Sequence, residues 1–86
     1  MTTELTPEHD ARKSFHGKAT VRTYGTTKTL YSYGVAVADI APFEIPAVQL
    51  FAAWDYSPTT LRHVKEFLRQ NGFKADTKTQ IERDYA

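Results

Sequence analysis

The sequence predicts one α+β domain in which a three- or four-stranded antiparallel sheet is packed by one amphipathic helix, at about residues 58–71. Residues 18–54 are rich in β-branched and aromatic side chains, and glycine and proline interrupt them at short intervals. Residues 57–72 carry apolar side chains at helical spacing between a start signal and a glycine. The total of 86 residues is enough for one small hydrophobic core.

The strands are predicted from their composition and from the breaks between them. Gly25 indicates a hairpin loop, because glycine tolerates positive φ angles. Gly34 indicates a bulge or a break inside a long β-rich stretch. Pro42 and Pro46 favour a loop before the last, apolar strand. The expected strand segments are residues 18–24, 28–40 and 47–54.

The helix is predicted from signals at both of its ends. Ser57 is suited to the N-cap position and Pro58 to the first helical position. Gly72 is expected to stop the helix after Asn71, with Phe73 folding back as the accompanying hydrophobic contact. The apolar stripe between these signals consists of Leu61, Val64, Phe67 and Leu68.

The two ends of the chain are polar. We expect residues 1–14 to be a flexible arm and residues 15–86 to form the single domain. Near the C-terminus, Ile81 and Tyr85 are four residues apart, a spacing that allows one short helical turn.

Charge is balanced in total and uneven along the chain. The net charge is +1, which argues against a dedicated polyanion-binding protein. Residues 11–38 contain no acid and residues 29–61 contain no base, so the chain can present one basic and one acidic surface.

The absence of cysteine excludes disulfides, zinc–thiolate sites and cysteine nucleophiles. A secreted domain of this size usually needs disulfides, so we expect a cytoplasmic location. The N-terminal residues lack the apolar core of a signal peptide, and no apolar run has the length of a membrane span.

Sequence patterns for catalysis and metal binding are weak, so we expect a non-enzyme with no metal and no cofactor. His9, His16 and His63 lack the close spacing of metal ligands. His63 is more typical of a packed or interfacial histidine, at the edge of the apolar helix face. Ser57 and the threonines after it are explained by the helix start, and no Gly-x-Ser-x-Gly elbow is present.

The predicted helix carries basic residues opposite its apolar stripe, at Arg62, Lys65 and Arg69. This face either binds a partner or is simply solvated, with Glu66 pairing to a neighbouring arginine. The aromatic residues offer a similar choice between core packing, partner contact and base stacking, because tyrosine and tryptophan are enriched at binding hot spots. These aromatic residues are Tyr31, Tyr33, Trp54 and Tyr56.

Two motifs in the chain resemble a family. Leu30–Tyr33 reads L-x-S-Y and Tyr56–His63 reads Y-S-x-T-T-x-R-H. In these motifs, and over residues 14–85, the chain resembles a group of small uncharacterised bacteriophage and prophage proteins of Gram-positive hosts. The resemblance implies a binding protein that occludes a host protein, with an anti-CRISPR inhibitor of a Cas effector as one form. The alternative is a weak nucleic-acid-binding accessory or regulatory protein.

These hypotheses name two sets of contact residues. The residues expected to contact a partner protein are Tyr33, Tyr56, Thr59, Arg62, His63, Lys65 and Arg69. The residues expected to contact nucleic acid, under the alternative, are Arg12, Lys13, Lys18, Arg22 and Lys28. No membrane partner is expected. A homodimer is a further option, because a sheet packed by one helix leaves one face uncovered.

Overall fold

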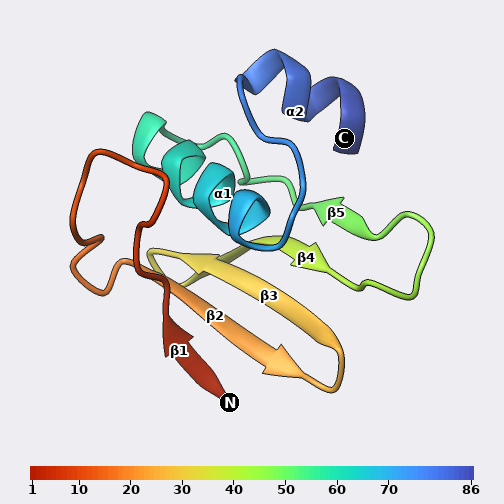
Figure 1. Ribbon diagram of the computed structural model, residues 1–86, viewed down its shortest axis with the longest axis horizontal. Coiled ribbons are helices and arrows are strands. Elements are labelled where there is room, and N and C mark those ends of the chain that lie inside the picture. Colours follow the sequence, from red (N-terminus) through yellow and green to blue (C-terminus); the bar gives the residue numbers. More distant parts are fainter.

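The computed structural model describes all 86 residues and contains one antiparallel sheet and two helices (Figure 1). The elements in chain order are β1 (Thr2–Glu4), β2 (Ala19–Tyr24), β3 (Thr27–Ser32), β4 (Val35–Ile40), β5 (Val48–Leu50), α1 (Pro58–Gln70) and α2 (Lys78–Tyr85). Strand order in the sheet is β1-β2-β3-β4-β5, so every strand pairs with its neighbour in the sequence. Neither helix combines the length and the apolar character needed to cross a membrane.

The predicted α+β class is confirmed, and the predicted number of elements is wrong. The sheet has five strands rather than three or four, and the short helical turn allowed by the spacing of Ile81 and Tyr85 is a second helix, α2. Both additional features are short. The edge strand β1 contains only Thr2–Glu4, which are all exposed and show no alternation of apolar and polar residues. Helix α2 has eight residues and buries only Gln80 and Ile81, so its apolar periodicity is minimal.

The two glycines predicted to interrupt the strands lie in tight hairpins. Gly25 has a φ of 63° in the two-residue turn between β2 and β3. Tyr33 and Gly34 form the turn between β3 and β4, with φ angles of 52° and 79°. Positive φ at both central residues is the type I′ pattern, whose twist matches that of the flanking strands. Gly34 therefore marks a break between two strands, one of the two predicted options.

Both predicted ends of α1 are confirmed. The Ser57 side chain accepts a hydrogen bond from the Thr60 N–H at 3.1 Å, and Pro58 occupies the first helical turn. At the other end Gly72 has a φ of 84° and its N–H donates to the Arg69 carbonyl. The Phe73 N–H donates to the Leu68 carbonyl at 2.9 Å, which completes a Schellman motif.

The hydrophobic core lies between α1 and one face of the sheet. Val21, Leu30 and Ala38 lie opposite one another on β2, β3 and β4, and Leu30 and Ala38 are fully buried on the face that α1 covers. Helix α1 inserts Phe67, which is fully buried, into this face. Both helices lie on the same side of the sheet (Figure 1). The opposite face is formed by polar and half-exposed residues, including Thr20, Arg22, Thr29 and Tyr31.

The N-terminal residues, expected to form a flexible arm, lie against the domain. After β1 the side chain of Leu5 is buried in the core. The chain then crosses α1, where the Thr6 carbonyl accepts a hydrogen bond from the Gln70 amide at 2.7 Å. The buried Glu66 carboxylate accepts the His9 backbone N–H at 2.8 Å and also the Gln70 amide. Glu66 therefore holds the N-terminal segment instead of pairing with an arginine of its own helix.

We expect Glu66→Ala to lower the free energy of unfolding by about 1–3 kcal/mol, because the His9 N–H loses its acceptor in a partly buried position. Urea denaturation measures the loss, and amide hydrogen exchange should accelerate at His9. The control is Glu82→Ala on α2, where the side chain is exposed and the change should stay within about 0.5 kcal/mol. Equal losses for the two variants would contradict the assignment.

Candidate functional site

An open apolar pocket of about 330 Å³ lies between the β3–β4 hairpin and the start of α1. Its lining residues come from three parts of the chain that meet here: Ser32, Tyr33, Val35, Val37, Ala53, Tyr56 and Thr60. We call this the tyrosine pocket. It brings together two of the predicted partner-contact residues, Tyr33 and Tyr56, which are 23 positions apart in the sequence.

Tyr33 has a positive φ angle of 52°, a backbone conformation that is unfavourable for tyrosine. The first central position of a type I′ turn prefers asparagine, aspartate or glycine, and a larger L-residue with a positive φ costs roughly 1–2 kcal/mol. This conformation aims the Tyr33 ring at the pocket, where its centroid is 5.8 Å from that of the His63 ring. The Lys18 ammonium lies 5.5 Å from the Tyr33 centroid, within the range of a cation–π contact. Strained residues of this kind cluster at functional sites.

Hydroxyl groups form the floor of the tyrosine pocket. The Ser32 and Thr60 side-chain oxygens are 3.2 Å apart, and the Ser57 hydroxyl lies 3.1 Å from Thr60. Ser32 also lies 2.8 Å from Nδ1 of His63, behind the floor. The pocket thus combines apolar walls with a few fixed polar groups, a combination typical of recognition sites.

His63 supports this floor from the core. Its side chain is completely buried, packs edge-on to Phe15 at 4.6 Å between ring centroids, and leaves Nε2 without a hydrogen-bond partner. Burial lowers the pKa of His63, the nearby Arg12 charge lowers it further, and Asp10 acts in the opposite direction. His63 is therefore neutral at pH 7, and its side chain, predicted to contact a partner, lies below the surface of this structure.

The Ser32–His63 pair has the spacing of a nucleophile and a base, but its surroundings differ from those of a hydrolytic site. Ser32 is almost fully buried, and no carboxylate accepts a hydrogen bond from the imidazole. Hydrolase triads use such a carboxylate to orient the histidine. The pair joins α1 to β3. No group of three His, Asp or Glu side chains is arranged to hold a metal ion.

Large apolar side chains at the rim of the tyrosine pocket are exposed. Tyr56 is 83% exposed, Tyr33 53% and Val35 52%. The other two predicted aromatic residues lie elsewhere, since Trp54 is buried in the core and Tyr31 lies on the open face of the sheet. The sequence did not indicate Val35 as a contact residue, because a valine in a β-rich stretch is expected to be buried in the core. The dipeptide Tyr33-Gly34 was the available signal, since it places an aromatic residue in a turn.

The predicted basic stripe lines a second, shallower depression along the outer face of α1. Its volume is about 400 Å³, and Arg62, Lys65 and Arg69 all contribute to it. Arg62 pairs with Asp10 at 3.2 Å, and Arg69 lies 3.9 Å from Asp76. Lys65 has no carboxylate partner. The helix face is therefore partly neutralised, by acids from outside α1. Thr59, the remaining predicted contact, is half-buried in the first turn.

The five residues of the nucleic-acid alternative do not form one surface. Arg22 pairs with Thr29 and Lys28 with Thr23, so these two bases lie on opposite faces of the β2–β3 ribbon. Arg12 and Lys13 are exposed in the segment that crosses α1, and Lys18 lies beside Tyr33 as described above.

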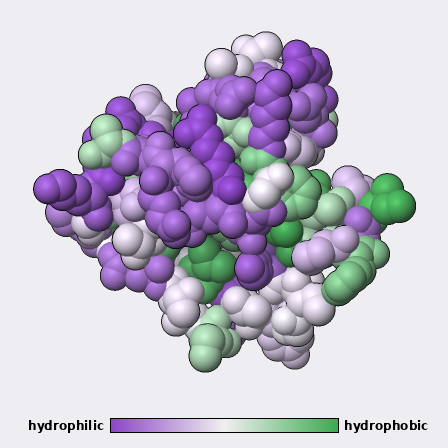
Figure 2. Space-filling view, viewed as in Figure 1, coloured by the Kyte–Doolittle hydropathy of each residue, from purple (hydrophilic) through white to green (hydrophobic).

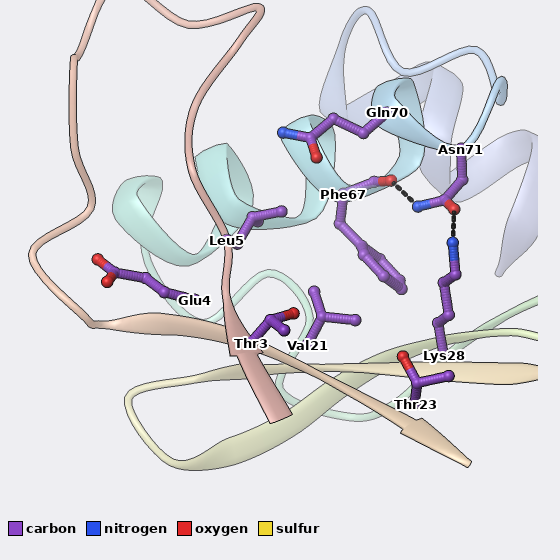
Figure 3. Close-up of a pocket in the computed structure, with 9 residues that line it drawn as sticks. All are labelled: Thr3, Glu4, Leu5, Val21, Thr23, Lys28, Phe67, Gln70 and Asn71. Atoms are coloured by element: carbon purple, nitrogen blue, oxygen red, sulfur yellow. Dashed lines mark hydrogen bonds between the residues drawn. The ribbon is translucent and has the colours of Figure 1, made fainter. Parts of the chain in front are cut away.

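Lys28 belongs to a third depression, of about 230 Å³, between the sheet and the C-terminal end of α1 (Figure 3). Its ammonium donates to the Asn71 side-chain oxygen at 3.0 Å, and the Asn71 amide donates to the Phe67 carbonyl at 2.8 Å. Figure 3 shows this chain of contacts beside Leu5 and Val21. A cation near a helix C-terminus is favourable, so this arrangement attaches α1 to β3.

We expect the stability of the protein to fall as the pH is lowered from about 7 to about 5. Because burial lowers the pKa of His63, the unfolded chain takes up a proton below its usual value of about 6.5 while the folded chain resists it. His63→Phe should flatten this dependence in denaturant titrations at several pH values. His16→Asn is the matched control, because His16 is exposed and its positive φ suits asparagine. A loss of stability that persists in His63→Phe would overturn this account.

Comparison with known proteins gives one result for the whole chain. No curated protein matches it, and no solved structure matches it. A family model described as a family of unknown function matches residues 3–83, which include strands β2 to β5, helix α1 and most of β1 and α2. The chain, including its tyrosine pocket and both motifs around it, therefore belongs to the family of unknown function DUF8033.

Proposed function

We propose that this protein is a small binding module whose protein partner inserts an apolar or aromatic side chain into the tyrosine pocket. The observation that carries the proposal is the ring of exposed Tyr56, Tyr33 and Val35 around an open pocket. Exposed apolar side chains gathered around a concave site are typical of protein interaction surfaces. Tyrosine supplies large contact areas there at a low cost in conformational entropy.

The basic face of α1 supports the same interface. Thr60 in the first turn of α1 lines the tyrosine pocket, and Pro58 and Leu61 begin the depression that leads to Lys65. One partner surface can therefore cover both depressions. Lys65 and the exposed half of Arg62 favour acidic residues at the edge of that surface and a faster encounter.

We further propose, from the resemblance to phage and prophage proteins, that the partner is a protein of the bacterial cytoplasm and that binding acts by steric occlusion. A CRISPR effector is one such target. The dimensions of the domain, 32 × 31 × 22 Å, suit a rigid plug on a larger protein. Binding by occlusion needs no catalytic group.

A weak nucleic-acid-binding function is the second proposal. The observation that favours it is that Arg12, Lys13 and Lys18 have no carboxylate partner within salt-bridge distance. It requires a steep dependence on salt, with a log–log slope of about −0.9 for each phosphate contact on duplex DNA. Titration of labelled duplex at several salt concentrations measures this slope, and a flat response would reject the second proposal.

We expect Tyr56→Ala to abolish capture of the partner in a pull-down from nuclease-treated bacterial lysate, because truncating a hot-spot tyrosine costs about 2 kcal/mol or more. The matched control is Tyr24→Ala. Tyr24 is also 83% exposed but lies beside the β2–β3 turn, away from the tyrosine pocket. Equal capture by the two variants would contradict the proposal, and capture that depends on intact nucleic acid would favour the second one.

We expect Tyr33→Asn to separate binding from stability. Asparagine suits the first position of a type I′ turn, so relief of backbone strain should offset the lost packing of the Tyr33 ring. The melting temperature should change by only a few degrees, while partner capture should be lost with the pocket wall. Retained capture, or a collapse in stability with unchanged capture of the folded fraction, would show that Tyr33 acts only in the fold.

A further inference from the structure

The loop between β4 and β5 presents two large apolar side chains to solvent. Phe43 is 86% exposed and Ile45 is fully exposed. Figure 2 shows strongly hydrophobic atoms at the margin of the molecule where Figure 1 draws this loop. The loop has an ordered base, because the Ala41 N–H donates to the Ala47 carbonyl at 2.8 Å and the Glu44 N–H donates to the Ala41 carbonyl. The apolar side chains are thus displayed on a projection with a hydrogen-bonded base, which we call the β4–β5 knob (residues 42–46).

The molecule also contains a site of matching chemistry. The tyrosine pocket is apolar, open and about 330 Å³ in volume. An apolar cavity of about 150 Å³ is enough to hold a benzene ring, so this pocket has room for the Phe43 ring and part of a second side chain.

Charge provides a second match. Glu44 lies between Phe43 and Ile45 and forms no ion pair within its own chain. Lys18 lies over the ring of Tyr33, one of the residues that line the tyrosine pocket, and has no carboxylate partner either. A knob seated in the pocket can place the Glu44 carboxylate near the Lys18 ammonium.

The knob and the pocket of one molecule cannot meet. Strand β4 begins at Val35, beside the pocket, and ends at Ile40, just before the knob. Six residues of strand span about 20 Å. Figure 1 shows the β3–β4 turn and the β4–β5 loop at opposite ends of strand β4. Any contact between them must join two copies of the chain.

We propose that the β4–β5 knob of one copy docks into the tyrosine pocket of a second copy, with Phe43 in the pocket and Glu44 beside Lys18. The contact uses two different surfaces, so it is head-to-tail and can repeat along an open chain or close into a ring. It is small, and a dissociation constant of roughly 0.1–1 mM is expected for a contact of this size.

This inference rests on the proposed function for the use of the pocket and adds a second occupant to it. A second copy and the partner protein require the same walls, Tyr33 and Tyr56, so they compete. At high concentration, self-association then occupies the tyrosine pocket, and binding of the partner protein displaces the second copy.

Analytical ultracentrifugation from about 10 µM to about 1 mM tests the contact. The wild-type protein should show an average mass that rises with concentration. The knob variant, Phe43→Ser with Ile45→Ser, should remain a monomer, and so should the pocket variant, Val35→Asp with Tyr56→Ala. All four changed side chains are exposed, so both variants should fold, which circular dichroism checks.

Mixing the two variants gives the sharpest test. The knob variant keeps its pocket and the pocket variant keeps its knob, so one contact forms and no further copy can join. The average mass of the mixture should rise with concentration toward the mass of a dimer and should not exceed it. Lys18→Glu should weaken wild-type association at least about tenfold, and the added change Glu44→Lys should restore it.

A wild-type protein that remains monomeric at all concentrations would overturn this inference, as would variants that still associate or a mixture that does not. The proposed function is tested separately, since the knob variant should still capture the partner. If the pocket variant loses capture of the partner but still self-associates, the claim that both occupants use the same pocket is contradicted. If the knob variant captures the partner protein but the wild-type protein does not self-associate, only the docking of a second copy is rejected, and the proposed function stands.

Discussion

Burial of one face of α1 against one face of the sheet is the interaction on which the rest of this structure depends. Val64, Phe67 and Leu68 are completely buried there, and each contributes about 1.5–3 kcal/mol relative to an exposed position. A chain of 86 residues has no second core to compensate for its loss. The contacts of α1 with the N-terminal segment, such as the hydrogen bond from His9 to Glu66, assume that α1 is already in place.

The same packing creates the tyrosine pocket. Where α1 begins, its inward side chains are Thr60 and His63 instead of large aliphatic residues, and the facing position on β3 is Ser32. These small or polar groups do not fill the space between the sheet and the start of α1. The Tyr33 and Tyr56 rings flank the resulting gap without closing it. The tyrosine pocket, our proposed recognition site, thus lies at the end of the helix–sheet interface where apolar packing gives way to hydrogen bonding.

The sequence predicted the parts of this fold that rest on local chemistry. The Ser57 cap, the Gly72 stop and the break at Gly34 each follow from the preferences of single residues, and the structure confirms all three. Strand β1 was missed because Thr2–Glu4 pair with a strand almost twenty residues away and bury no side chain. Pairing of Glu66 with an arginine of its own helix was one option from the sequence, and the structure shows instead that Glu66 accepts the backbone N–H of His9, which is 57 positions away and leaves no local signal.

In the candidate site, too, the sequence predicts the features set by single residues and misses those set by long-range contacts. Tyr33 and Tyr56 could be named from residue type, since tyrosine near a turn is a frequent contact. Their shared pocket depends on how a hairpin meets a helix start, and no spacing along the chain encodes it. Arg22 and Lys28 illustrate the reverse case, in which residues close in sequence are separated by the alternation of a strand.

The strand order has a consequence for how the chain reaches this structure. Each strand pairs only with its neighbours in sequence, and the β2–β3 and β3–β4 turns contain two residues each. Such local pairings need little loop closure, and chains with low contact order fold rapidly. The central hairpins can form before α1 has been synthesised, and the helix then docks on a prepared surface. All five strands precede α1 in the chain, so no distant segment is needed to complete the sheet, and the tyrosine pocket, which needs Tyr56 and Thr60, is complete once α1 has docked.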